Sequence, residues 1–251
     1  TDYQRIREQH AGKKALPMVS LDAARKNKFA LRFDGDSAPV KPKFIGRRHF
    51  RNFDLAILAN YIDWGPFFQT WDLAGPFPAI LKDPVVGEQA SNVYKEGQAL
   101  LKKLVEGRWL TANAVIGLYP ANRVGDDDIA LYADEARERP VLVWHGLRQQ
   151  AEKAEVDGVV RPSRCLADFV APQGVARDYV GVFAVTAGLG VENKERQFLA
   201  DHDDYAAILF KALADRLAEA LAEQMHHRVR TDLWGYAAGE SLSNEDLIAE
   251  K

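Results

Sequence analysis

Apolar residues recur at a helical spacing in two long segments of the chain. Between residues 85 and 105 they fall about every 3.6 positions, which predicts an amphipathic helix. Residues 202–233 carry an apolar stripe on one side and predict the longest helix of the protein. The stripe consists of Leu209, Leu213, Leu217, Ala220 and Leu221. Residues 52–62 predict a shorter helix or turn that leads into an aromatic run.

Short apolar runs elsewhere in the chain predict strands. They lie at residues 115–119, 129–132, 141–144, 166–170 and 179–186. Pro120 is expected to end the first run. The last run is apolar along nearly all of its length, which predicts a central strand. The links near Gly125 and Gly174 are short and favour antiparallel neighbours, so the pattern indicates an α+β fold rather than a doubly wound α/β sheet.

The N-terminal part of the chain lacks a sustained period. It is charged and is interrupted by Pro17, Pro39 and Pro42. We interpret residues 1–43 as an arm or linker that contains at most a short helix around residues 21–27. Residues 44–251 are interpreted as one domain.

Composition narrows the class of protein. The formal net charge of -3 excludes a general nucleic-acid binder, because a polyanion requires a strongly basic face. No apolar run approaches the roughly 20 residues of a membrane-spanning helix, so we expect no membrane association. Cys165 is the only cysteine, which excludes an internal disulfide and a cluster of cysteine ligands and favours a cytoplasmic location.

The histidines do not predict a metal site. His226 and His227 are adjacent and therefore point to different sides of a helix. His145 and His202 lack other ligands at a suitable spacing, apart from the two acids that follow His202. No motif of a catalytic nucleophile is present either, so we predict neither a metal nor a catalytic residue.

Asp63 lies inside the aromatic run, among Tyr61, Trp64, Phe67 and Phe68. A carboxylate near aromatic rings requires a cation or several hydrogen bonds, because an unpaired charge in apolar surroundings is unfavourable. An ammonium or sulfonium group of a ligand would meet that need. The alternative is that Asp63 caps a helix that starts at the following Gly-Pro pair. The residues alone leave both interpretations open.

Asp215 and Glu219 lie four residues apart on one flank of the helix predicted at residues 202–233. Like charges at this spacing repel each other slightly, so a cation, a ligand or another domain is expected to compensate them. The alternative is a solvated helix face on which Arg216 supplies the compensation.

Motifs that occur in order along nearly the whole chain carry a family resemblance. They are N-Y-I-D-W at 60–64, P-F-F at 66–68, G-L-Y-P-A-N-R-V-G-D-D at 117–127, H-G-L-R-Q-Q at 145–150, C-L-A-D-F-V-A-P at 165–172, H-D-D-Y at 202–205, K-A-L-A-D-R-L-A-E-A at 211–220 and W-G-Y-A at 234–237. Together they resemble the C-terminal activation domain of cobalamin-dependent methionine synthase, which binds S-adenosylmethionine. Residues 1–7 resemble the linker from the cobalamin module of that enzyme.

This resemblance implies a C-shaped α+β domain with a twisted, mainly antiparallel sheet flanked by helices. The parent enzyme is a methyltransferase of methionine biosynthesis that moves a methyl group from methyltetrahydrofolate to homocysteine through cobalamin. When the cobalamin is oxidised to cob(II)alamin, the activation domain brings S-adenosylmethionine to it, and flavodoxin or a diflavin reductase supplies an electron. The implied cofactors are S-adenosylmethionine and the cobalamin of the adjacent module. We expect no turnover by this chain alone.

The resemblance also implies roles for three acids. At the matching positions Asp63 holds the amino group of S-adenosylmethionine, Glu219 lies in the same ligand cleft, and Asp215 faces the cobalamin module. The family pattern continues into R-x-x-x-G-Y, whose arginine binds the ligand carboxylate, whereas this sequence stops at Lys251. We therefore expect residues 1–251 alone to bind the ligand weakly. The alternative function is a non-catalytic docking fragment that contacts a cobalamin module or a flavodoxin-type reductase.

Overall fold

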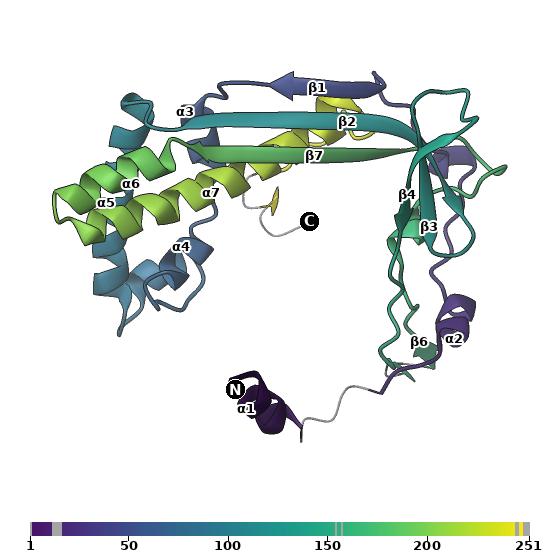
Figure 1. The fold of residues 1–251 in the computed structure, drawn as a ribbon, viewed down its shortest axis with the longest axis horizontal. Coiled ribbons are helices and arrows are strands. Elements are labelled where there is room, and N and C mark those ends of the chain that lie inside the picture. The colour runs from purple at the N-terminus through teal and green to yellow at the C-terminus, as the bar shows by residue number, and fades with distance from the viewer. Residues whose placement is uncertain (1, 12–16, 154, 157, 244–245, 248–251) are drawn as a thin grey trace. The chain divides into compact units, whose positions relative to one another are not determined.

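The computed structural model describes residues 2–11, 17–153, 155–156, 158–243 and 246–247. The chain divides into two compact units (Figure 1). The first unit comprises Thr1–Lys41 and Tyr119–Val180, and the second comprises Pro42–Leu118 and Gly181–Lys251. Each unit is therefore assembled from segments that are distant in the sequence.

The second unit contains β1 (Gly46–Phe50) and parts of two long strands, β2 (Thr111–Val124) and β7 (Asp178–Leu189). β1 pairs with β2 in antiparallel register, with Gly46 opposite Leu118. β7 also pairs with β2. From Thr111 to Ile116 the side chains of β2 alternate between half-buried and buried, which places one face of this part of the strand on the core.

Helices make up the rest of the second unit. In chain order they are α3 (Leu55–Leu58), the 3-10 turn η2 (Ala59–Tyr61), α4 (Gly65–Gln69), the 3-10 turn η3 (Ala79–Lys82), α5 (Gly87–Glu106), α6 (Val191–Ala200), α7 (Asp204–Arg228) and the π-helical turn η5 (Val229–Leu233). The N-cap of α7 is Asp203, whose carboxylate accepts the N–H of Ala206 at 2.9 Å. α7 packs against α3, η2, α4, α5 and α6, so it is the central helix of this unit.

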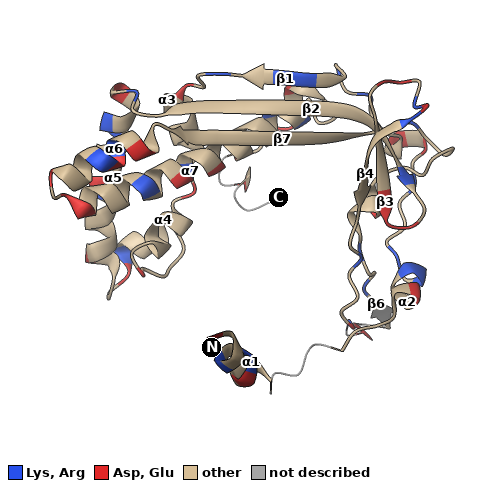
Figure 2. Ribbon diagram, in the orientation of Figure 1, with Lys and Arg blue, Asp and Glu red and all other residues tan. Residues whose placement is uncertain are grey.

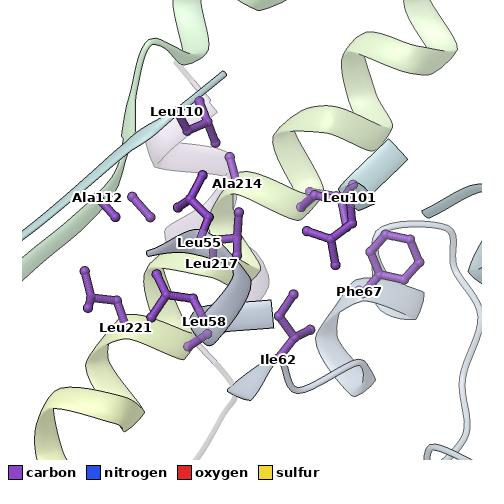
Figure 3. Close-up of a cluster of buried hydrophobic side chains, with 14 of the residues drawn as sticks. Leu55, Leu58, Ile62, Phe67, Leu101, Leu110, Ala112, Ala214, Leu217 and Leu221 are labelled. Atoms are coloured by element: carbon purple, nitrogen blue, oxygen red, sulfur yellow. The ribbon is translucent and has the colours of Figure 1, made fainter. Parts of the chain in front are cut away.

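The core of the second unit is one cluster of apolar side chains (Figure 3). Leu213, Leu217 and Leu221 of α7 are completely buried in it, as the predicted stripe requires. Burying a leucine side chain stabilises a fold by about 1.5–3 kcal/mol. A Cβ at Gly97 of α5 would lie 2.8 Å from Cζ of Phe67, so glycine permits the close approach of α5 to α4.

The first unit is built from short elements. They are α1 (Asp2–His10), α2 (Leu21–Lys26), the 3-10 turn η1 (Gly35–Ser37), β3 (Asp128–Tyr132), β4 (Pro140–His145), β5 (Glu155–Val156), β6 (Val159–Val160) and the 3-10 turn η4 (Leu166–Phe169). β2 pairs with β3, β3 with β4, and β5 with β6, in each case antiparallel. The core of this unit is smaller. It consists of Ala121, Ile129, Leu131, Cys165, Ala167 and Val170.

The predicted α+β class with a mainly antiparallel sheet is confirmed. The helices predicted at residues 85–105 and 202–233 correspond to α5 and to α7 with η5. The C shape and the division into residues 1–43 and 44–251 stay predictions. Among the described helices, none is both long enough and apolar enough to cross a membrane.

One strand boundary and one whole strand were predicted wrongly. β2 continues through Pro120, because this residue lies between the stretch that pairs with β1 and the stretch that pairs with β3. Neither of these pairings uses the N–H that proline lacks. Residues 166–169 of the predicted strand 166–170 form η4, because the carboxylate of Asp168 accepts the N–H of Cys165 at 3.0 Å and holds the chain in a tight turn.

β7 is not a central strand. In the part of the chain that the structure describes it pairs with β2 alone, and its residues 181–184 are exposed. The N-terminal segment also contains more structure than one short helix, because α1 precedes α2. None of the residues of α1 is buried, so hydrophobic periodicity had no signal by which to reveal this helix.

Candidate functional site

Asp63 lies in the short link between η2 and α4. Its neighbours Ile62 and Trp64 are 3% and 7% exposed, so the backbone is fixed on both sides of the carboxylate. Oδ1 of Asp63 accepts the N–H of Gly65, the first residue of α4, at 2.8 Å. Trp64 is the N-cap residue of α4, so Asp63 stabilises the start of this helix from the position before the cap. Oδ2 forms no hydrogen bond or ion pair within the described residues, so one carboxylate oxygen is left for another group.

The aromatic residues around Asp63 pack mainly against protein. Phe67 and Phe68 are completely buried, and Trp64 contacts Phe67 and Tyr94 of α5 edge-on, with ring centroids 5.1 and 4.9 Å apart. Such edge-to-face pairs fix the positions of the rings. The rings therefore anchor the link that carries Asp63 to the core.

Asp215 and Glu219 both lie on the exposed side of α7, one turn apart. Leu213 and Leu217 of the same helix face the core, which fixes the direction of this acidic flank. Figure 2 shows charged residues of both signs on α6 and α7. Nη2 of Arg216 lies 2.7 Å from Oε1 of Glu219, so Arg216 compensates one of the two acids.

A cavity of about 490 Å³ lies beside Asp215. Its lining combines apolar residues of α6 and α7 with three acids and one lysine. These residues are Thr70, Glu195, Leu199, Asp204, Ala207, Ile208, Lys211, Ala212 and Asp215. Lys211 and Glu195 form an ion pair at 3.0 Å across the two helices. Glu219 does not line this cavity, so the two acids of the flank have different surroundings.

The fold brings the three predicted site residues to the same unit. η2 and α4, the elements on either side of Asp63, both pack against α7, which carries Asp215 and Glu219. Within the described residues no hydrogen bond or ion pair joins Asp63 to either of these acids. The three carboxylates therefore lie in the second unit, on α7 or beside elements that pack against it, without a hydrogen bond or ion pair between them.

A buried charge network lies in the first unit, which the sequence analysis did not single out. Arg148 donates two hydrogen bonds to Asp168, at 2.8 and 2.9 Å, and both side chains are 0% exposed. Nε of Arg148 also donates to Asp127 at 2.7 Å. The hydrogen bond to Asp168 is the main cause of a raised pKa at Arg148, which remains charged. The sequence did carry a signal for this network, because its members Asp127, Arg148 and Asp168 each lie in one of the motifs at 117–127, 145–150 and 165–172.

The N-terminal segment extends this network. Arg25 of α2 binds Asp127 at 2.7 Å, and Lys28 binds Asp126 at 2.7 Å. Main-chain hydrogen bonds add to these pairs, from the N–H of Val19 to Gln150 and from Ser163 to the carbonyl of Asn27, both at 2.9 Å. Residues 17–28 therefore pack as part of the first unit.

The candidate metal ligands do not converge. No group of three or more His, Cys, Asp or Glu side chains that could hold a metal ion occurs within the residues that the structure describes. Cys165 is buried, and its Sγ lies 3.6 Å from the carbonyl oxygen of Asp127, so the thiol packs as part of the core.

Comparisons with known proteins show the family to which this chain belongs. The family described as "Vitamin B12 dependent methionine synthase, activation domain" matches residues 54–251. A solved structure described as "Crystal Structure of the MetH Reactivation Domain bound to AdoHcy" is 48% identical in sequence and superposes with a TM-score of 0.84. This match covers 93% of the present chain and 70% of the other. The chain therefore belongs to the family of activation domains of vitamin B12 dependent methionine synthase.

Proposed function

We propose that this chain binds S-adenosylmethionine and supports the reductive remethylation of cob(II)alamin on the adjacent cobalamin module of methionine synthase. The observation that carries the proposal is the 48% identity to a reactivation domain with bound AdoHcy, which is S-adenosylhomocysteine. S-adenosylmethionine would supply the methyl group, and flavodoxin or a diflavin reductase would supply one electron. Methylcobalamin and S-adenosylhomocysteine are then the products.

Asp63 is proposed to bind the α-ammonium group of the ligand, and Glu219 is proposed to lie in the same ligand cleft. An ammonium group has three N–H donors, and carboxylate oxygens are its strongest acceptors in a protein. Oδ2 of Asp63 has no acceptor role within the described residues, while Oδ1 is fixed by Gly65. The side chain of Glu219 is 58% exposed, so it is accessible to a ligand.

Asp215 is proposed to face the cobalamin module. The support for this role is its exposed position on α7 at the edge of the cavity between α6 and α7. A charged group at the rim of an interface acts mainly on orientation and association rate. The methyl transfer from methyltetrahydrofolate to homocysteine belongs to the parent enzyme, and we assign no residue of this chain to it.

The change Asp63→Asn in complete methionine synthase tests the ligand contact. Asparagine still accepts the N–H of Gly65, so the start of α4 is retained while the negative charge is lost. Losing one charge-assisted hydrogen bond is expected to weaken S-adenosylhomocysteine binding by about 1.5–3 kcal/mol in calorimetry.

The matched control is Asp54→Asn. Asp54 also accepts the N–H of the residue two positions later, Ala56, at 2.9 Å at the start of α3, and it has no proposed ligand contact. This variant should bind the ligand with unchanged affinity. Equal affinities for the Asp63 variant and the wild type would reduce Asp63 to a helix cap.

A further inference from the structure

The ion pair between Arg216 and Glu219 on α7 is asymmetric. The side chain of Arg216 is 12% exposed, whereas that of Glu219 is 58% exposed. The guanidinium group is therefore anchored by its surroundings, and the carboxylate reaches into solvent. Only Oε1 of Glu219 is engaged, at 2.7 Å from Nη2, so Oε2 remains available to another donor.

The second terminal nitrogen of Arg216, Nη1, has no acceptor of its own among the residues that the structure describes. Nη1 is buried and forms no hydrogen bond within the described residues. A buried charged donor without an acceptor is unfavourable. The charge of Arg216 is therefore compensated mainly by its ion pair with Glu219. In the described part of the chain Glu219 is the one carboxylate within ion-pair distance of Arg216, although Asp215 is adjacent in sequence.

We propose that Arg216 is a positioning residue for the ligand site: it holds Glu219 so that Oε2 is presented to the α-ammonium group of the ligand. This inference rests on the proposed function, because it gives Arg216 a role only through Glu219. A free glutamate on a helix surface samples many rotamers and loses that freedom when a ligand binds. A glutamate already held by an anchored guanidinium group loses less, which favours binding.

A second effect of Arg216 opposes the first. Its positive charge repels an ammonium group bound to the same carboxylate. Water screens this repulsion, because Glu219 is more than half exposed. When Arg216 is removed, Glu219 loses its fixed orientation, and water does not screen this effect. We therefore expect orientation to dominate, so that removing Arg216 weakens binding.

The test is a set of variants in complete methionine synthase, measured by calorimetry with two ligands. S-adenosylhomocysteine carries the amino group, and 5′-methylthioadenosine lacks it. Arg216→Met should weaken binding of the first about two- to tenfold, the effect of ordering one flexible side chain. Binding of the second should not change. Arg216→Lys, which keeps the charge but offers a single-point donor, should have a smaller effect.

The variant Glu219→Gln shows whether Arg216 acts by positioning Glu219 or only by packing in the protein. Adding Arg216→Met to this variant should cause no further loss, because the arginine then has no carboxylate to orient. The matched control is Arg228→Met, which removes another α7 arginine that is paired with an exposed acid, Asp232. This control should bind both ligands like the wild type, and melting temperatures verify that each variant is folded.

Three results would overturn the proposal. They are unchanged or tighter binding of S-adenosylhomocysteine by the Arg216→Met variant, an equal loss for both ligands, and an undiminished loss in the Glu219→Gln background. If Glu219→Gln alone leaves S-adenosylhomocysteine binding unchanged, the role of Glu219 in the proposed function fails, and the positioning role fails with it. A loss with Glu219→Gln but none with Arg216→Met rejects the positioning role alone.

Discussion

Arg148 and Asp168 form a two-point ion pair in the interior of the first unit. Nη1 lies 2.9 Å from Oδ2 and Nη2 lies 2.8 Å from Oδ1, and neither side chain is exposed. Arg148 also donates from Nε to Asp127. One guanidinium group therefore binds the turn between β2 and β3 to η4, in a unit whose apolar core is small. Charged hydrogen bonds of this geometry are the strong ones in proteins.

Asp168→Asn is expected to destabilise the first unit. The change removes one of the two carboxylates that Arg148 binds and leaves Asp127 as the other. Breaking a buried pair from one side costs about 3–5 kcal/mol, and the remaining bond to Asp127 should hold the loss near or below the lower end of that range. Denaturant unfolding followed by a probe in the first unit measures the effect. Asp134→Asn, at an exposed acid that accepts the N–H of Ala136, is the control and should shift stability by less than about 0.5 kcal/mol. Similar losses for both variants would contradict a special role of the buried pair.

The same pair predicts a dependence of stability on pH. Burial by itself would raise the pKa of Asp168, but hydrogen bonds from Arg148 and from the N–H of Cys165 outweigh it and hold the pKa below its ordinary value. The ionised pair therefore stabilises the fold above about pH 4, and this contribution is lost as the pH falls through the lower folded-state value. The difference in unfolding free energy between the wild type and Asp168→Asn should shrink in acid. A difference that grows below about pH 4 would contradict this assignment.

The N-terminal segment is expected to protect the network that it contacts. Arg25→Gln removes the ion pair to Asp127 and should increase amide hydrogen exchange across residues 17–28. Lys26→Gln, one residue further in α2, is the control, because Lys26 forms no ion pair within the described residues. A chain that begins at residue 30 should also melt at a lower temperature than one that begins at residue 17. Equal melting temperatures would show that the segment adds nothing to the fold.

Asp215→Ala tests the proposed interface with the cobalamin module. The reactivation rate of oxidised methionine synthase should fall, because a charge at the proposed contact is lost. The melting temperature should stay nearly constant, since an exposed substitution usually changes stability by less than about 0.5 kcal/mol. Asp201→Ala, at an exposed acid between α6 and α7, serves as the control and should leave the rate unchanged. A collapse of the melting temperature would make Asp215 a structural residue.

The sequence by itself determined the elements whose signal is local. The leucine stripe predicted α7, and the apolar spacing at residues 85–105 predicted α5, because a helix repeats its pattern within a few turns. The sequence also marked the acids at positions 63, 215 and 219 as candidates, by the aromatic neighbours of the first and the spacing of the other two, and their binding roles stay predictions. The order of motifs along the chain indicated the family, which the comparisons confirm.

Tertiary structure decided what depends on distant residues. An apolar run does not reveal how many neighbours a strand has, so the edge position of β7 was predicted wrongly. Arg25 and Asp127 are 102 positions apart, and no local pattern relates them. Likewise Asp63 proved to serve α4 with one oxygen and to leave the other free, a division that the sequence had left as two alternatives. Hydrogen-bond partners and burial are properties of the packed chain, because they depend on segments that meet only when it folds.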